Sequence, residues 1–428
     1  MYSRYQLGCY VAACFLSAAF CVSAQPANTP GLTILHTFSA TNYASGYSPT
    51  GAIAVGANGV LYGTTQYGGI YNQIFGCSEG CGTVYSLTPP TAPGGTWAEN
   101  VLWSFGATST DAYFPSYGVT MGPDGVLYGE SAGGPGACGT VFSLTPPAQP
   151  GGSWQEAIVY AFTCGADGGS PNSSLAIDAN GVLYGTGQWG STGKDCANGC
   201  GTVYTLTPPA TPGGDWTETV LWNFSQGGGT WPIGGVVLGP GGVLYGITQN
   251  DGFSDQDGVA YSLTPPAAPG GSWTETVLYR FSLSSGQHPV ALTLGANGVL
   301  YGTTYLNDKN NQQGGTIYSL TPPASPGGAW TESTLRTFPT QPYAASVSTN
   351  PYGPLLIGGQ SGYLFGTTAS GTGNGTVFAA APPQAPGGNW TAHLLEEQYT
   401  IEPSIGLMHG GALYGTDWFE NLVWVLVP

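Results

Sequence analysis

The sequence contains little charge, and very little of it is positive. Only 6% of the 428 residues are charged, and Lys and Arg together number 5 against 22 Asp and Glu, for a formal net charge of -17. A nucleic-acid ligand requires several cations to replace the counterions on its phosphates, and an anionic membrane surface attracts basic segments. The composition therefore excludes nucleic acid and an anionic membrane as partners.

Beyond the N-terminus the sequence also lacks long apolar runs and any sustained helical periodicity. The N-terminus itself has the parts of an export signal: Arg4, the apolar stretch "LGCYVAACFLSAAFCV" and the small-residue site "VSA" before Gln25. A membrane anchor is the alternative, but the apolar run is short for a span. "VAAC", ending at Cys14, resembles a lipoprotein box, although the apolar residues continue past it.

These features predict the organisation of the chain. We expect a signal peptide at 1–24, a short lead at 25–31 and a single domain at 32–428, with no transmembrane segment in the mature chain. The predicted localisation is outside the cytoplasm, whether periplasmic, on the cell surface or extracellular. We expect a monomer.

What the sequence has in abundance is Gly (72), Pro (34), Tyr (26) and Trp (12). High Gly and Pro content can indicate disorder. Here these residues lie between apolar, aromatic and β-branched runs, which is the pattern of turns between strands.

The strongest signal is internal repetition. "GVLYG" or a close variant begins seven times, at intervals of 49 to 66 residues: Gly59, Gly125, Gly181, Gly242, Gly298, Gly362 and Gly411. This period is in the range of β-propeller blades. One unit reads as four strands, which we call first to fourth: "PIGGVVLG", "VLYGTT", "GTVYSLTP" and, after "PxxPGGxW", "TETVLWNF". "ANG", "PDG" or "PGG" joins the first two strands, and such residues accept the positive φ of a two-residue hairpin turn.

The two ends of the chain carry complementary fragments of this unit. "VWVLVP", 423–428, aligns with a third strand and has no fourth strand after it, whereas "TILHTF", 33–38, aligns with the fourth strand "NVLWSF", 100–105. Pairing them closes a ring and removes open sheet edges. The predicted fold class is an all-β, seven-bladed β-propeller of four-stranded blades. An open solenoid is the alternative, but it would not need complementary ends.

Two repeat families resemble this pattern. The order "LYG…GG", strand, Trp and outer strand is similar to the Kelch repeat, which implies that the first strand lines the channel and the fourth is outermost. The wording "LYGTT…GTVYSLTP" more closely resembles the GloVer-type (Gloeo-Verruco) tandem repeat of exported bacterial proteins, over essentially the whole mature chain. This second resemblance implies the fold and export, and it does not point to any particular activity.

Loop lengths distinguish the two faces of such a disc. The step from the "SLTPP" leucine to the next Trp is ten residues, as from Leu87 to Trp97, so this face is scaffold and the Trp is expected to pack between blades. The loops between second and third strands vary from 23 residues (Tyr62 to Tyr85) to 10 (Tyr414 to Trp424). We therefore expect a ligand on the variable face.

That face is rich in aromatic, acidic and amide residues, a mixture that suits glycan binding. The ligand-binding candidates are Trp231, Phe114, His288, Tyr47, Trp189, Tyr305 and Trp418. Phe114, Trp231 and His288, like Glu402, precede a first-strand proline, so they are expected at the channel mouth. The alternative is that the rings fold back onto their own loops.

Six cysteines remain after the signal, an even number that suggests disulfides in an exported chain. Cys77–Cys81 and Cys196–Cys200 are local pairs, and the hairpin register brings Cys138 to Cys164. Zinc would need four ligands, and no histidine lies nearby. "NDGFSDQDG", 250–258, offers Asp251, Asp255 and Asp257 as weak candidates for structural calcium, against an Asx-rich turn; we expect no other cofactor.

Arginine and histidine are too few for several propeller chemistries. A sialidase needs clustered arginines, a Kelch-type copper oxidase needs paired histidines and a serine triad needs a placed histidine. Only His288 is suitably placed. A carboxylate-pair glycosidase is still open, through Glu402 with Asp417 or Asp167 with Asp111.

The predicted function is a non-catalytic, exported module that binds a polysaccharide. The alternatives are a glycan-cleaving enzyme, hydrolase or lyase, and a structural or adhesive protein whose partner is a surface protein.

Overall fold

The protein is described by a computed structural model. The described residues are 31–39, 43–73, 76–92, 94–136, 138–149, 151–191, 196, 199–211, 213–252, 257–268, 270–306, 314–325, 327–338, 349–358, 362–370, 375–384, 389–396 and 403–428. Within them, no helix is long and apolar enough to cross a membrane. The predicted signal at 1–24 lies outside this part of the chain.

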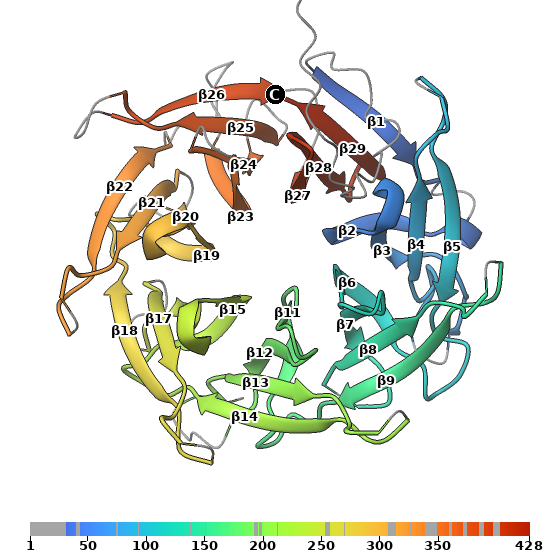
Figure 1. Ribbon diagram of the computed structural model, residues 1–428, viewed down its shortest axis with the longest axis horizontal. Helices are drawn as coiled ribbons and strands as arrows, with labels where there is room; N and C mark the ends of the chain where they lie inside the picture. Colours follow the sequence, from blue (N-terminus) through green and yellow to red (C-terminus); the bar gives the residue numbers. More distant parts are fainter. Residues whose placement is uncertain are drawn as a thin grey trace, which may run out of the picture.

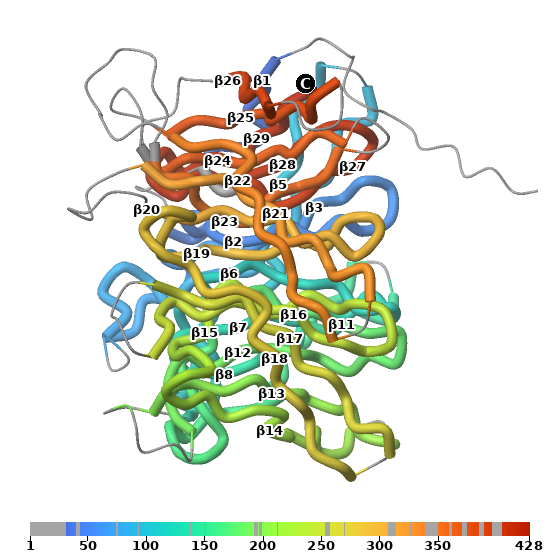
Figure 2. The backbone as a smooth tube through the Cα atoms, turned by 90° about the vertical axis from the view of Figure 1, so that its left-hand side faces the viewer, coloured from blue at the N-terminus to red at the C-terminus, as the bar shows by residue number. Residues whose placement is uncertain are grey.

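The fold is all-β, in a propeller-like arrangement. Groups of four strands lie around a common centre, and the last strand of each group is outermost (Figure 1). Seen edge-on, the groups form a disc (Figure 2). Two of the groups count as one eight-stranded sheet, because the innermost strands β2 and β6 share a parallel bridge between Ala52 and Gly118.

The strands of each unit follow the chain from the centre outwards. Units 1 and 2 contain β2 (Tyr47–Val55), β3 (Leu61–Tyr67), β4 (Thr83–Thr88), β5 (Ala98–Ser104), β6 (Tyr113–Met121), β7 (Leu127–Gly133), β8 (Thr140–Thr145) and β9 (Gln155–Ala161). Units 3 and 4 contain β10 (Gly169–Pro171), β11 (Ala176–Ile177), β12 (Leu183–Trp189), β13 (Thr202–Thr207), β14 (Thr217–Asn223), β15 (Thr230–Leu238), β16 (Leu244–Asn250), β17 (Val259–Thr264) and β18 (Thr274–Arg280).

Units 5 and 6 contain β19 (Gln287–Leu294), β20 (Leu300–Leu306), β21 (Thr316–Thr321), β22 (Thr331–Thr337), β23 (Thr349–Gly358), β24 (Tyr363–Ser370), β25 (Thr376–Ala381) and β26 (Thr391–Glu396). Unit 7 contains β27 (Pro403–His409), β28 (Ala412–Asp417), β29 (Leu422–Val427) and β1 (Gly31–Thr37).

Unit 7 is assembled from both ends of the chain, as the sequence predicts. β1 pairs antiparallel with β29, with Gly31 opposite Val427 and Thr37 opposite Leu422. The sheet order β1-β29-β28-β27 repeats the order of the other units. The outer edge of β29 is therefore covered by a strand that precedes it by almost 400 residues.

The glycine of "LYG" is explained by its cross-strand neighbour. Gly63 on β3 lies opposite Tyr85 on β4, whose ring crosses the glycine. A Cβ at Gly63 would lie 2.4 Å from the Tyr85 hydroxyl, which is too close for any other residue. The repeat therefore requires a glycine on the second strand wherever the third strand carries a large ring.

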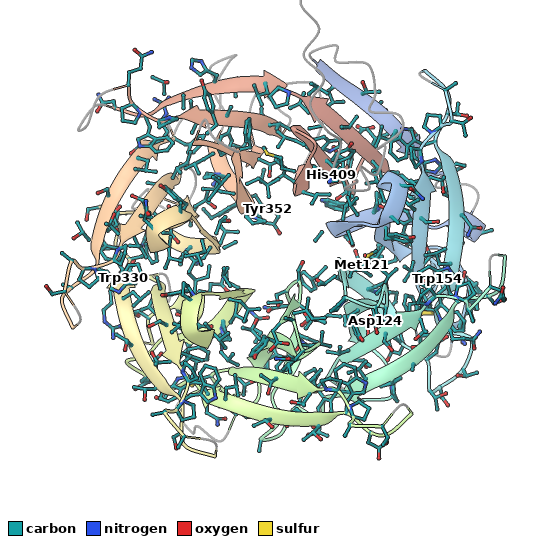
Figure 3. All side chains as sticks on the ribbon, in the orientation of Figure 1. Met121, Asp124, Trp154, Trp330, Tyr352 and His409 are labelled. Atoms are coloured by element: carbon teal, nitrogen blue, oxygen red, sulfur yellow. A yellow bond between two sulfur atoms is a disulfide. The ribbon has the colours of Figure 1, made fainter. Side chains whose placement is uncertain are left out.

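Aromatic rings connect neighbouring units on both sides of this pair. In six of the seven units a Phe follows the fourth strand, and it packs on the third-strand ring of the next unit, as in Phe38–Tyr85 and Phe224–Tyr261 with ring centroids 4.9 and 5.0 Å apart. The Trp after the Pro-Gly-Gly turn contacts the "LYG" tyrosine of the preceding unit, for example Trp154 on Tyr62. The prediction that this Trp packs between units is confirmed, and Figure 3 places Trp154 and Trp330 towards the outside of the ring.

The turns between first and second strands also match the prediction in their backbone. Asn58 and Gly59 both have positive φ, 59° and 74°. The turn is longer than expected, because the Gly56 amide donates to the Val60 carbonyl and leaves three residues between them.

Candidate ligand-binding face

The loops that follow the second strands and the loops that precede the first strands meet on the variable face. In unit 1 the Gly69 amide donates to the Tyr43 carbonyl at 2.5 Å, and the Tyr47 hydroxyl donates to the Glu79 carboxylate at 2.7 Å. In unit 3 the Ser191 amide donates to the Gly165 carbonyl at 3.1 Å. The loops after the second strands therefore lie against the loops that precede the first strands, as the alternating strand directions require.

A continuous chain of rings crosses this face from unit 1 to unit 2. Tyr43 contacts Tyr47, Tyr47 contacts Tyr67, Tyr67 contacts Phe114 and Phe114 contacts Tyr113, with centroids 5.5 to 6.0 Å apart. Tyr43 is 51% exposed, whereas Tyr47, Tyr67 and Phe114 are half-buried. Two predicted ligand residues, Tyr47 and Phe114, are thus brought together through Tyr67, another aromatic residue of this face.

The residue before each first-strand proline has an unusual backbone. At the six described positions φ is positive, between 52° and 61°, although the residue is not glycine: Ser48, Phe114, Ser170, Trp231, His288 and Asn350. L-residues rarely adopt this conformation. The seventh such position, Glu402, lies outside the described residues.

Amide hydrogen bonds fix this conformation to the preceding unit. The amides of Phe114, Ser170 and Trp231 donate to the carbonyls of Cys81, Cys138 and Cys200 at 2.7 to 2.9 Å. Ser48 donates instead to the Asn421 side chain at 2.7 Å.

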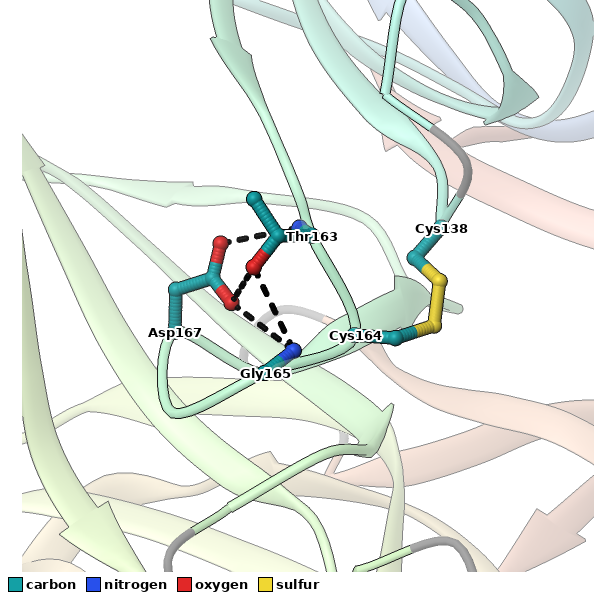
Figure 4. Close-up of a disulfide and its surroundings, with 5 residues drawn as sticks. All are labelled: Cys138, Thr163, Cys164, Gly165 and Asp167. Carbon is teal, nitrogen blue, oxygen red and sulfur yellow. Dashed lines mark hydrogen bonds between the residues drawn. A yellow bond between two sulfur atoms is a disulfide. The ribbon is translucent and has the colours of Figure 1, made fainter.

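The three predicted disulfides are all present: Cys77–Cys81, Cys138–Cys164 and Cys196–Cys200. Each contains the cysteine whose carbonyl accepts one of these amides. Figure 4 shows Cys138–Cys164 beside the loop that leads into β10. The disulfides therefore support the face that carries the pre-proline residues, in addition to pinning loops.

The other predicted aromatic candidates lie around the same side of the units. Trp231, Trp189 and Trp418 are 39%, 43% and 38% exposed, and Trp418 contacts Phe419. Tyr305 is half-buried, and its ring lies 6.4 Å from that of Tyr352. Tyr352 lies at the inner edge of the ring (Figure 3).

His288 is half-buried and approaches the Gln249 amide nitrogen through Nδ1 at 3.5 Å. Burial lowers the pKa of His288, against a smaller opposing effect of the Asp257 charge. The imidazole is therefore neutral at pH 7 and suited to hydrogen bonding rather than to ion pairing.

The predicted acid residues are held within their own loops. Asp167 accepts from the Thr163 hydroxyl at 2.6 Å and from the Gly165 amide at 3.1 Å (Figure 4). Asp111 accepts from the Ala107 amide at 3.0 Å. Asp417 is fully buried and accepts from the amides of Phe419 and Glu420.

Each of the two loop aspartates faces a glutamate of the next fourth strand. Burial, then the charge of Asp111, raises the pKa of Glu156 to about 7. Burial, then the charge of Asp167, raises that of Glu218 to about 7. Among the described residues, each loop aspartate is thus coupled electrostatically to an outer glutamate rather than to the other aspartate. Glu402, the proposed partner of Asp417, lies outside the described residues.

The calcium candidates are described only in part. Asp257 accepts from the Gln287 side chain at 2.7 Å, and Asp255 lies outside the described residues. In the part of the chain that is described, no three His, Cys, Asp or Glu side chains cluster as a metal site would require.

Glu130 was not among the residues predicted from the sequence, and it is the only charged residue at its position in the repeat. The other units have "LYGT", "LYGI" or, in unit 6, "LFGT", whereas unit 2 has "LYGE". Glu130 is 1% exposed; its Oε1 accepts from the Tyr204 hydroxyl and its Oε2 from the Ser173 amide, both at 2.8 Å. Burial raises the pKa of Glu130 to about 8.

Glu130 also explains a local irregularity. The innermost strand of unit 3 is interrupted between β10 and β11, where the Ser173 amide leaves the strand ladder and donates to the carboxyl. The signal in the sequence was a charged residue at a position that faces the core in every other unit.

Comparison with solved structures supports the fold. The chain is similar to a candidate 6-phosphogluconolactonase from Bacteroides uniformis, with 16% identity and a TM-score of 0.51 over 86% of this chain and 91% of that one. A candidate gluconolactonase matches with 12% identity and a TM-score of 0.40, over 94% and 93% of the two chains. These identities are too low to carry function from one chain to the other. Comparison with curated proteins gives no match.

The repeat itself is matched directly. The family model of the Gloeobacter/Verrucomicrobia repeat matches residues 20–197 and 73–310, which together cover more than half of the chain. This is the repeat that the motifs "LYGTT" and "GTVYSLTP" resemble. The chain belongs to the Gloeobacter/Verrucomicrobia repeat family.

Proposed function

We propose that the protein is a non-catalytic module that binds a neutral glycan on the variable face. The observation that carries the proposal is the chain of five touching rings from Tyr43 to Tyr113, which extends over two units and ends in an exposed tyrosine. Aromatic rings stack on the apolar faces of sugars, and the Glu79 carboxylate beside Tyr47 offers an acceptor for sugar hydroxyls.

The charge of the chain supports a neutral ligand. With 22 acidic residues and 5 basic ones, the protein repels sulfated, uronic or phosphorylated polymers. Of the two arginines in the body of the chain, Arg280 already donates to the Gly227 carbonyl.

We infer that the four-stranded groups form one closed, seven-bladed propeller, and that the protein is exported. The pairing of β1 with β29 supports closure, since it joins the two ends of the chain in one sheet. Three disulfides support export, because cytosolic thiols are kept reduced. A closed ring holds its loops rigidly on one face, which favours binding without a large ordering cost.

The test is incubation of the disulfide-intact protein on an array of neutral and acidic polysaccharides, with bound protein and released reducing ends read from the same wells. We expect binding to neutral polymers without release. Phe114→Ala should weaken that binding, whereas Ile34→Ala, an exposed apolar residue of the outermost strand β1, should not. No binding to any polysaccharide would contradict the proposal and direct the search to a protein partner.

A second candidate is hydrolysis of a sugar ester or lactone. It is favoured by the whole-chain similarity of fold to a candidate 6-phosphogluconolactonase. The scarcity of cations argues against a phosphorylated substrate, so the substrate would be neutral. Acid release from a neutral lactone at constant pH tests it, and loss of that activity in Asp417→Asn would assign the carboxylate. Release of reducing ends from a polysaccharide would indicate glycan cleavage instead.

A further inference from the structure

The residues before the first-strand prolines of units 2 to 5 are Phe114, Ser170, Trp231 and His288, which we call the pre-proline row. We propose that this row forms successive contact positions, one per unit, for a linear neutral glycan. The inference deepens the proposed function and rests on it.

The first argument is the identity of the residues at a strained position. Six of the eleven non-glycine residues with positive φ in the described chain occupy this one position of the repeat. Glycine adopts such a backbone at no steric cost, whereas a Cβ makes it unfavourable. The chain has 72 glycines and uses none of them here in six units. Residues with side chains therefore occupy positions where the positive φ alone would favour glycine. Backbone outliers of this kind concentrate at functional sites.

The second argument is that backbone and side chain have separate tasks. The amides of Phe114, Ser170 and Trp231 all donate to the preceding unit, and this bond is the same for Phe, Ser and Trp. This backbone hydrogen bond between units therefore does not depend on the identity of the side chain. It is free to differ from unit to unit, as it does.

The third argument is exposure. At the two ends of the described series, Ser48 and Asn350 are 7% and 3% exposed, and Asn350 donates through its side chain to the Tyr305 carbonyl. By contrast, the four residues of the pre-proline row are half-buried or exposed, and Trp231 is 39% exposed. Among the six described positions, the accessible ones thus belong to four consecutive units, which form one arc around the centre (Figure 1).

The chemistry of the row points to the class of ligand. It offers two rings for stacking, a hydroxyl at Ser170 and a neutral imidazole at His288, and the ring chain through Tyr67 and Tyr47 continues it beyond Phe114. A polymer with alternating apolar faces and hydroxyl groups, without charge, matches this order. A compact ligand would contact one or two of these positions, not an arc of four units.

The test compares Trp231→Ala, Trp231→Gly and Ser170→Gly with the native protein, using the neutral polysaccharide that binds best on the array and its oligosaccharides of increasing length. We expect both Trp231 variants to bind at least about tenfold more weakly, as for loss of an aromatic anchor. We expect affinity to rise with oligosaccharide length until the arc is covered. Thermal unfolding should show Trp231→Gly more stable than Trp231→Ala, and Ser170→Gly should raise Tm by about 1–2 °C.

The outcomes separate the row from the proposed function. Binding by the native protein that is unchanged in both Trp231 variants would overturn the row and leave the glycan module intact. An affinity that stops rising with oligosaccharide length at the disaccharide would also overturn the pre-proline row and leave the glycan module intact. An alanine variant more stable than the glycine variant would show that the position is not strained, which removes the first argument. Absence of any glycan binding by the native protein would overturn both.

Discussion

The buried tyrosines on the third strands differ in whether their hydroxyl has a hydrogen-bond partner. Tyr85, Tyr204, Tyr261 and Tyr318 are fully buried at the same position of four units. Tyr204 donates to Glu130, whereas the hydroxyls of the other three have no hydrogen-bond partner among the described residues. Units 2 and 6 carry Phe142 and Phe378 in the same place, so the packing of the ring does not depend on the hydroxyl.

The first prediction compares two removals of the same hydroxyl. Tyr261→Phe should leave the free energy of unfolding unchanged or raise it, because it deletes a buried polar atom without a partner. Tyr204→Phe should lower it by about 1–3 kcal/mol, since it leaves Glu130 Oε1 buried and unpaired. Urea denaturation of both variants measures the difference. Equal effects in the two variants would contradict the role assigned to Glu130.

The second prediction concerns the charge of Glu130. Its folded-state pKa of about 8 lies above the ordinary value of 4.5, so the folded protein binds this proton more tightly than the unfolded chain. Its contribution is complete below about pH 4.5 and is lost as pH rises through about 8. Glu130→Gln, neutral at every pH, should therefore lose less stability than the native protein between pH 5 and 9. Parallel Tm curves against pH would show that the carboxyl is not protonated in the fold.

At the scale of elements, disulfides and loops act on the same surface. Cys138–Cys164 joins the loops on either side of β8 and β9 and spans 26 residues, whereas Cys77–Cys81 spans 4. Closing a longer loop removes more conformational entropy from the unfolded chain. The long bridge should therefore contribute more to stability, although one cysteine of each bridge, Cys138 and Cys81, supplies a carbonyl to the variable face.

The third prediction follows from this difference. Replacing both Cys138 and Cys164 with Ser should lower the free energy of unfolding by about 3–4 kcal/mol, against about 2 kcal/mol for the same change at Cys77 and Cys81. Chemical denaturation of the two double variants gives both values. A larger loss at the short bridge would mean that local strain or packing outweighs chain entropy.

For the whole molecule, the sheet shared between the two ends is the feature on which the arrangement depends. β1 covers the edge of β29, and Phe38, just after β1, packs on Tyr85 of unit 1 at 4.9 Å. The N-terminal strand thus contacts units 7 and 1 together. Its removal would expose an apolar strand edge and separate two neighbouring units.

The fourth prediction is that deletion of the chain up to Phe38 lowers Tm by many degrees and causes self-association through β29. Light scattering and thermal unfolding measure both effects. A synthetic peptide of residues 31–38 should restore the native Tm by adding the missing strand, and a scrambled peptide should not. A truncated protein that stays monomeric with native Tm would contradict closure of the fold by this strand.

A fifth prediction belongs to the outer rim, where the second residue of five fourth strands is a glutamate with a raised pKa: Glu99, Glu156, Glu218, Glu275 and Glu332. Burial is the main cause in each, and Glu156, Glu218 and Glu275 titrate near pH 7 in the fold. Their contribution to stability is complete below about pH 4.5 and falls as pH rises through about 7. Tm should therefore be higher at pH 5 than at pH 8, and the combined Glu156→Gln and Glu218→Gln variant should reduce the difference. A Tm that rises with pH would contradict this assignment.

The sequence predictions were more accurate for features within one repeat than for contacts between units. Strands and disulfides were predicted correctly, because strand periodicity, cysteine spacing and hairpin register are visible within one or two repeats. The positive φ of the turns was predicted from the Asn-Gly pairs, but the turns are longer than the two residues expected. The pairing of β1 with β29 was predicted because the repeat aligned two distant fragments. Glu130 and the outer glutamates were missed, since their environments are made by neighbouring units that no single repeat contains.

The sequence by itself determined the repeat, the four strands of each unit, the disulfide pairs and the family. Each depends on residue types at fixed spacing, which remain visible without coordinates. Only the tertiary structure decided which side chains meet: the rings from Tyr43 to Tyr113, the Glu130–Tyr204 contact and the positive φ of the pre-proline residues. The physical reason is that burial, desolvation and backbone strain arise where units pack on one another, and a residue's spacing in the sequence does not encode its neighbour in the next unit.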